Sequence, residues 1–183
     1  MRQNSHSQKC CVLIDGSYVD RLSRSLRFDF DELAVCLRSR YHVTNIVYFC
    51  IVPSIENDFP KRRLLDWLSY NGYVVKEKVS QKTESNYATE QSDSLSLNLV
   101  LYALESCTYA DGIIFISDDP DICAGISALQ RNSKWVALLG DGSRSSRGVS
   151  SVLRRAADVF LPLQSIFGCH GPGQAKHFPD DRR

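Results

Sequence analysis

The sequence contains no hydrophobic run long enough to cross a membrane. A membrane-spanning helix needs about 20 consecutive apolar residues, and the longest apolar runs, such as IVYFCIVP, are far shorter. The chain opens with the polar residues MRQNSHSQK, and we expect no secretory leader. The sequence therefore predicts a soluble, cytoplasmic protein that does not enter a membrane.

An excess of one charge is also missing. The 183 residues include 22 Lys and Arg against 21 Asp and Glu, a formal net charge of +1. This balance excludes a uniformly basic nucleic-acid coat and a polyanionic tail protein. Any site for nucleic acid must be local.

Several side-chain sets that carry chemistry are absent. The four histidines are scattered, and no Cys-His or Ser-His-Asp set can be assembled. The segment GDGSRSSRG resembles a phosphate loop but lacks the Gly-Lys-Ser/Thr ending of a nucleoside triphosphate site. The seven cysteines are an odd number, several of them in apolar runs, which favours buried thiols in a reducing compartment.

The length and a hydrophobic content of 43% suit one domain with a sizeable core. We expect residues 1–9 to be a flexible N-terminus and residues 10–165 to be the folded domain. Residues 166–183 are rich in Gly, Pro and charge, which is typical of a disordered tail.

Buried-strand runs alternate with helical periods along the domain. The pattern predicts strands over 10–16, 45–53, 72–76, 112–117, 135–139 and 159–163, and helices over 29–40, 58–70, 92–106, 122–130 and 150–157. Residues 77–92 show neither period, and we expect a long loop there. The alternation predicts an α/β fold, a three-layer α/β/α sandwich with a mainly parallel central sheet.

Acidic residues follow two of the predicted strands, and another begins a predicted helix. Asp15 ends the first strand, Asp119 and Asp121 follow the strand that ends at Ser117, and Asp93 begins the helix after the long loop. Ligands of parallel sheets bind at the carboxyl ends of the strands, and clustered carboxylates repel one another unless a cation or proton intervenes. An oxygen-only set points to Mg²⁺ or Mn²⁺, which would activate water for phosphodiester hydrolysis.

Each acid also has a purely structural explanation. Asp15 before Gly16 is typical of a turn, and Asp119 before Pro120 is typical of a helix start. Asp158 fits a structural role better than a catalytic one. A phosphoryl-transfer enzyme with Asp15 as its nucleophile would be expected to carry Asp-x-Asp, whereas the sequence has Asp15-Gly16-Ser17.

Polar and basic residues near the predicted strand ends are candidates for substrate binding. Ser17 could bind a phosphate or a metal-bound water, or cap a helix N-terminus. Tyr18 and Tyr87 could each stack on a base of single-stranded RNA or simply pack within the protein. The full set of candidate substrate-binding residues is Ser17, Asn98, Ser117, Lys78, Lys82, Arg144 and Arg147.

Five segments resemble, in order, the NYN domain of LabA-like proteins within the PIN-like nuclease superfamily. They are CVLIDGS at 11–17, residues 73–76, residues 90–104, IFISDDPD at 114–121 and SVLRRAADVFLPL at 151–163. The resemblance spans about residues 10–163. It implies a metal-dependent endoribonuclease acting on RNA, expected to be single-stranded, with Mg²⁺ or Mn²⁺ held by Asp15, Asp119, Asp121 and Asp93.

The sequence departs from the family pattern at several positions. Asp118, Pro120 and Ile122 replace two glycines and a phenylalanine of the family's Ser-Gly-Asp-Gly-Asp-Phe, and Asn98 stands near the position of a second helix aspartate. An asparagine ligand brings no negative charge, so affinity for a second metal should fall. The alternative hypothesis is a catalytically weakened NYN domain that acts as an RNA-binding or protein-interaction module. A homo-oligomer is compatible with either.

Overall fold

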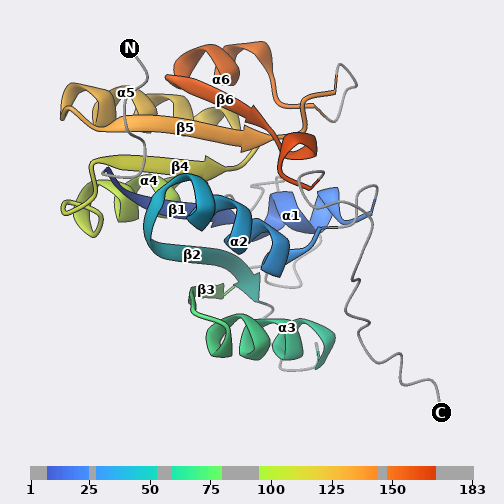
Figure 1. The fold of residues 1–183 in the computed structure, drawn as a ribbon. Coiled ribbons are helices and arrows are strands. Elements are labelled where there is room, and N and C mark those ends of the chain that lie inside the picture. The colour runs from blue at the N-terminus through green and yellow to red at the C-terminus, as the bar shows by residue number, and fades with distance from the viewer. Residues whose placement is uncertain (1–7, 25–27, 53–58, 80–94, 144–147, 168–183) are drawn as a thin grey trace, which may run out of the picture.

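A six-stranded sheet forms the centre of the protein in the computed structural model (Figure 1). The structure describes residues 8–24, 28–52, 59–79, 95–143 and 148–167. In chain order the elements are β1 Lys9–Asp15, α1 Gly16–Leu22, α2 Phe30–Arg40, β2 His42–Val52, α3 Phe59–Tyr70, β3 Tyr73–Val79, α4 Ser96–Glu105, β4 Gly112–Ile116, η1 Pro120–Ile122, α5 Cys123–Arg131, β5 Trp135–Gly140, α6 Ser151–Ala156, β6 Val159–Pro162 and η2 Leu163–Ser165.

All strand pairs are parallel, in the order β3-β2-β1-β4-β5-β6. The chain builds outward from β1 to β3, then crosses to β4 on the other side of β1. The strand order therefore reverses between β1 and β4. In parallel sheets, a crevice opens for ligands at the carboxyl ends of the two strands where this reversal occurs.

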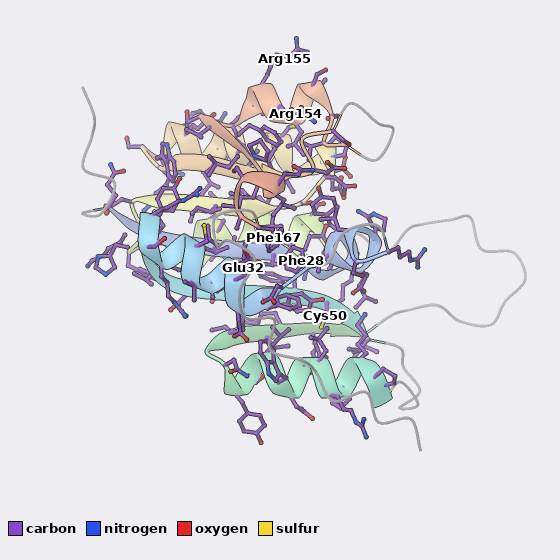
Figure 2. All side chains as sticks on the ribbon, turned by 45° about the vertical axis from the view of Figure 1, so that its right-hand side comes forward. Phe28, Glu32, Cys50, Arg154, Arg155 and Phe167 are labelled. Atoms are coloured by element: carbon purple, nitrogen blue, oxygen red, sulfur yellow. The ribbon has the colours of Figure 1, made fainter. Side chains whose placement is uncertain are left out.

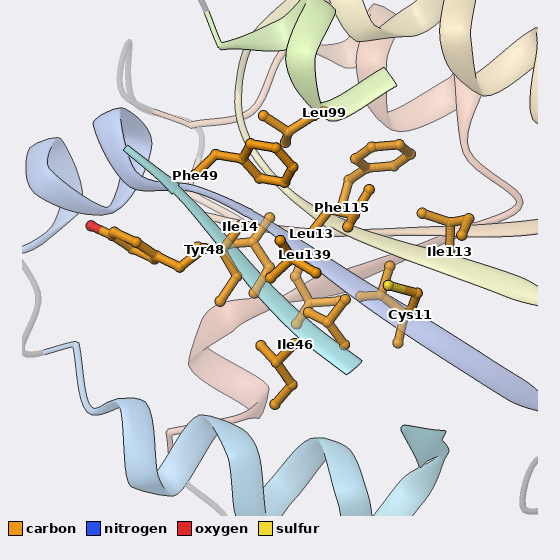
Figure 3. Packing of buried hydrophobic residues seen from close by; sticks show 14 of the residues in the cluster. Cys11, Leu13, Ile14, Ile46, Tyr48, Phe49, Leu99, Ile113, Phe115 and Leu139 are labelled. Carbon is orange, nitrogen blue, oxygen red and sulfur yellow. The ribbon is translucent and has the colours of Figure 1, made fainter. Parts of the chain in front are cut away.

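Helices cover both faces of the sheet. Neighbouring residues on a strand point to opposite faces, so two successive residues of β2 contact the two helix layers. Tyr48 of β2 packs edge-on against Phe30 of α2, with ring centroids 5.8 Å apart, and the next residue, Phe49, packs against Tyr102 of α4 at 5.5 Å. Figure 3 shows Phe49 with Leu99 on the side of α4, and Tyr48 on the side of α2. The predicted three-layer α/β/α sandwich is confirmed.

The two layers of helices extend along the sheet from these contacts. Phe30 of α2 also lies 6.3 Å from the ring of Trp67 on α3. On the other face α6 lies against α5, where the Gln130 side chain donates to the carbonyl of Ala156 at 3.0 Å. The last described residue, Phe167, returns to the first layer and packs edge-on against Phe28 at 5.2 Å (Figure 2).

Sequence patterns located the strands and most of the helices, with corrections at the ends of several elements and one helix that the pattern did not predict. The expected strand over 10–16 ends at Asp15, because Gly16 already begins α1, a helix that the pattern did not predict. The helix expected over 122–130 is preceded by the 3-10 turn of η1. β3 also runs three residues further than expected, to Val79.

The cysteines behave as apolar core residues. Six are free thiols in the part of the chain that the structure describes, and five of them are buried. The expectation of buried thiols is borne out there. Within the same residues no helix is long and apolar enough to span a membrane.

Candidate active site

Three buried polar or charged residues stand out in the described core: Asp15, Ser96 and Ser117, each at most 4% exposed. All three belong to one hydrogen-bonded cluster, which Asp119 completes. Buried polar groups cost free energy unless they are paired. A core that is otherwise apolar thus concentrates its polar groups at one point, where the strand order reverses.

Asp15 comes from the end of β1, where it caps α1. One carboxylate oxygen, Oδ1, accepts the backbone N–H groups of Ser17 and Tyr18 at 2.9 and 3.2 Å. The other, Oδ2, accepts the hydroxyl of Ser117 at 3.1 Å. Helix capping needs only an acceptor at Oδ1. The structural explanation of Asp15 as a cap therefore accounts for Oδ1, while Oδ2 faces the cluster.

Gly16 allows the chain to pass close to β2 directly after Asp15. A Cβ atom at this position would lie 2.5 Å from the carbonyl oxygen of Phe49 and 2.8 Å from the Tyr48 ring. No larger residue fits without displacing β2. The Asp-Gly pair therefore places a carboxylate at the strand end and packs the first turn of α1 against the neighbouring strand.

Ser117 follows β4 and connects the two aspartates. Its hydroxyl donates to Asp15 Oδ2 and accepts the backbone N–H of Asp119 at 3.2 Å. Because β1 and β4 are adjacent, with Ile14 opposite Ile116, residues 15 and 117 are the next pair beyond the ladder. Their closeness is a direct consequence of the strand order.

Asp119 caps η1, with Pro120 at the first helical position as the sequence predicted. Its Oδ1 accepts the backbone N–H of Asp121 at 2.9 Å, and its Oδ2 accepts the hydroxyl of Ser96 at 2.5 Å. The side chain of Asp121 is exposed. Asp119 is therefore held by three different segments: β4, η1 and the first residue of α4.

Ser96 is the site residue that the sequence analysis missed. The family comparison of residues 90–104 fixed on Asp93 and Asn98, but the α4 side chain that reaches Asp119 is Ser96. Asn98 is exposed and lines a groove on another side of α4. Its role as a candidate substrate-binding residue stays a prediction. A signal was available, since Ser96 lies in the buried stripe that includes Leu95 and Leu99.

Several candidates lie elsewhere or outside the described residues. Asp93, Lys82, Tyr87, Arg144 and Arg147 belong to segments that the structure does not describe. Lys78 lines the same groove as Asn98. Ser17 is half-buried and contributes its backbone N–H to Asp15.

Two other acids and one tyrosine have structural roles. Asp118 forms an ion pair with Arg21 at 2.5 Å. Asp158 accepts the backbone N–H of Val136 at 2.8 Å. Tyr18 is buried, and its hydroxyl accepts the backbone N–H of Asp141 at 2.8 Å, which is the packing alternative for this residue.

Burial controls the electrostatics of Asp15. It raises the pKa of the carboxyl group, against the opposing effects of the Tyr18 N–H, the Ser117 hydroxyl and the Arg21 charge. A charged carboxylate at this position is costly by itself. A cation bound at the cluster would remove part of that cost.

The donor set fits a single hard cation. Asp15 and Asp119 supply carboxylates, Ser96 and Ser117 supply hydroxyls, and Mg²⁺ in proteins is commonly bound by one or two carboxylates together with water. No three Asp, Glu, His or Cys side chains in the described ranges could hold one ion together. The described residues therefore fit one ion at two carboxylates rather than a centre with two ions.

The six-stranded parallel sheet, with helices on both faces, has the α/β architecture of a PIN-like domain. The NYN domain model matches residues 9–164, so the chain belongs to the NYN domain family. No curated protein matches the chain. A crystal structure of a Vibrio parahaemolyticus protein of unknown function is similar, with a TM-score of 0.69 and 22% identity over 91% of this chain and 98% of that one. This similarity supports the fold alone.

Proposed function

We propose that this protein is a metal-dependent endoribonuclease of the LabA-like branch of NYN domains, acting on single-stranded RNA in the cytoplasm. The observation that carries the proposal is the link from Asp15 through Ser117 to Asp119 at the switch point of the sheet. Asp15 is buried in an apolar core and Asp119 is half-buried beside it, and a carboxylate in such a place costs stability. A function in binding a cation accounts for that expense.

Asp15 and Asp119 would hold one Mg²⁺ or Mn²⁺ ion, and Asp93, which lies outside the described residues, is the candidate for a third carboxylate. Asp121 has an exposed side chain and does not join both of them on one ion. When bound, such an ion supplies an activated water and stabilises the charge that develops on a phosphodiester. The protein residues have simpler tasks. Ser117 orients Asp15 Oδ2, and Ser96 orients Asp119 Oδ2.

Cleavage of a labelled single-stranded RNA in Mn²⁺ tests the proposal. Asp119→Asn keeps the shape and the capping oxygen but removes the charge, and we expect it to lower the cleavage rate at least 100-fold. Asp118→Asn is the matched control, because Asp118 is the next residue and pairs with Arg21 outside the cluster. Equal cleavage by wild type and Asp119→Asn, or cleavage that persists in chelator, would contradict the proposal.

A second candidate function is an RNA-binding or protein-interaction module without catalysis. One observation favours it: each of the two clustered carboxylates already accepts a serine hydroxyl, and Ser96 occupies the α4 position nearest Asp119. Such a module would gain no thermal stability from Mn²⁺. The nuclease would gain about 2.7 kcal/mol at a hundredfold excess of the ion over its Kd.

A further inference from the structure

A groove lies between α4 and the carboxyl halves of β2 and β3, with a volume of about 270 Å³. This is smaller than a typical pocket for a drug-sized ligand, about 300–1,000 Å³. The groove therefore suits a single planar group rather than a large ligand.

The groove begins beside the acidic cluster. In the sheet register Asp15 is opposite Phe49, and Phe49 is opposite Lys76, so one row crosses from β1 to the edge strand β3. Two strand spacings separate the ends of that row, about 10 Å. On the α4 side, Leu95 lines the groove and the next residue, Ser96, contacts Asp119. A ligand that spans both places must reach across about 10 Å.

Aromatic and cationic side chains meet in the groove. Tyr102 is half-buried, and its ring packs edge-on against Phe49 at an interplanar angle of 79°. The ammonium of Lys76 lies 5.6 Å from the centre of the Tyr102 ring. Phe49 thus fixes the ring in place, while the long Lys76 side chain leaves its ammonium group able to move to a nearby anion.

Two lysines and two glutamates line the groove, and a neighbouring arginine adds one positive charge beside it. Lys76 and Lys78 line it together with Glu77 and Glu105, and the carboxylate of Glu77 lies 3.0 Å from Arg62. Asn98 adds an amide that can both donate and accept hydrogen bonds. An aromatic face, two lysines and an amide are the elements by which proteins bind a single-stranded base and its phosphate.

We propose that this groove binds one nucleotide of a single-stranded RNA, with its base on Tyr102 and its phosphate at Lys76 and Lys78. The proposal rests on the proposed function for the choice of RNA, and it deepens that function by placing a substrate subsite next to the acids. The edge of the sheet would then position the strand while the switch point acts on the neighbouring phosphodiester.

Equilibrium binding of a fluorescein-labelled single-stranded RNA in EDTA tests the subsite without cleavage. We expect Tyr102→Leu to weaken binding at least fivefold, because stacking on one aromatic ring carries that much affinity. Tyr102→Phe should bind like wild type, since the ring remains. Lys76→Gln should reduce the slope of log affinity against log salt by about 0.7, the effect of one phosphate contact on a single strand.

Two matched controls lie away from the groove. Tyr70→Leu changes a tyrosine that is 90% exposed at the end of α3. Arg155→Gln removes a cation on α6, which lies far from Cys50, the residue after the groove residue Phe49 (Figure 2). Both should leave RNA affinity unchanged. Thermal melting of every variant checks that it is folded. Because Lys76→Gln changes an exposed side chain, this variant still tests the subsite if Tyr102→Leu fails to fold.

The outcomes separate this proposal from the proposed function. The subsite is overturned if Tyr102→Leu and Lys76→Gln bind RNA with the affinity and the salt slope of the wild type. It is also overturned if the groove binds a protein segment and its variants leave RNA affinity unchanged. Wild-type cleavage in that case would still support the nuclease. Lost binding in the groove variants together with an inactive wild type would support the subsite and contradict the nuclease.

Discussion

Replacing Ser96 by Asp places a third carboxylate at the acidic cluster. The Ser96 hydroxyl lies 2.5 Å from Asp119 Oδ2, so an aspartate side chain at position 96 would bring two carboxylates to about 4 Å, where the repulsion of unit charges is about 4 kcal/mol at an effective dielectric constant of 20. Sharing a proton limits that cost. We expect Ser96→Asp to lower the free energy of unfolding by about 2–4 kcal/mol in EDTA at pH 7.

A divalent cation should reverse this loss, because it would neutralise the added charge. For a chain of this length, about 1 kcal/mol corresponds to 2–4 °C in Tm. In EDTA we therefore expect a Tm about 5–15 °C below wild type, and in millimolar Mn²⁺ a rise in Tm larger than that of wild type. The assay is thermal melting with and without Mn²⁺ over a range of concentrations.

Asn98→Asp is the matched control, two residues further along α4. Asn98 is exposed and faces the groove rather than Asp119, so its replacement should change neither the Tm in EDTA nor the response to Mn²⁺. The reasoning is refuted if Ser96→Asp melts like wild type in EDTA, or if its response to Mn²⁺ is no larger than that of Asn98→Asp.

Two further predictions concern stability. The Tyr48 hydroxyl is buried without a hydrogen-bond partner among the described residues, so Tyr48→Phe should raise the free energy of unfolding by about 1 kcal/mol. A lower free energy of unfolding for this variant, measured by urea denaturation, would contradict this. For Asp141, burial alone would raise the pKa, but hydrogen bonds from Ser143 and Gln164 hold it below its ordinary value. The charged form therefore stabilises the fold above the unfolded pKa, and Asp141→Asn should melt lower than wild type at pH 7, with a difference that shrinks as the pH falls below 4; a constant difference at every pH would rule out the charge as its cause.

The parallel sheet could be predicted from the sequence because its strands are short, continuous apolar runs. Segments such as GIIFI at β4 are buried along their whole length, which is the pattern of a parallel strand covered on both faces. Asp15 and Asp119 could also be placed, since Asp15 ends such a run and Asp119 stands three residues after the end of another. The strand order then brings them together, and the alternation of strands and helices alone does not specify that order.

The sequence was less informative where short-range rules compete. The segment GSYVDRL forms the seven-residue helix α1, which is too short for a clear helical period, and the Asp-Gly pair before it is equally typical of a turn. On α4, comparison with the positions of the family's aspartates selected Asp93 and Asn98, whereas a serine, Ser96, makes the contact with Asp119. A serine hydroxyl carries no charge, so the place of Ser96 in the stripe of Leu95 and Leu99 was the only signal that sequence reasoning could have used.

Single-turnover cleavage of labelled single-stranded RNA by the wild-type protein tests the central claim most directly. The site predicts cleavage that rises and saturates with Mn²⁺ or Mg²⁺, disappears in EDTA and returns when the ion is added back. It also predicts that Asp15→Asn and Asp119→Asn lose this activity while Asp118→Asn keeps it. RNA that stays intact at every metal concentration, in a preparation that is folded and binds RNA, would contradict the assignment as a nuclease.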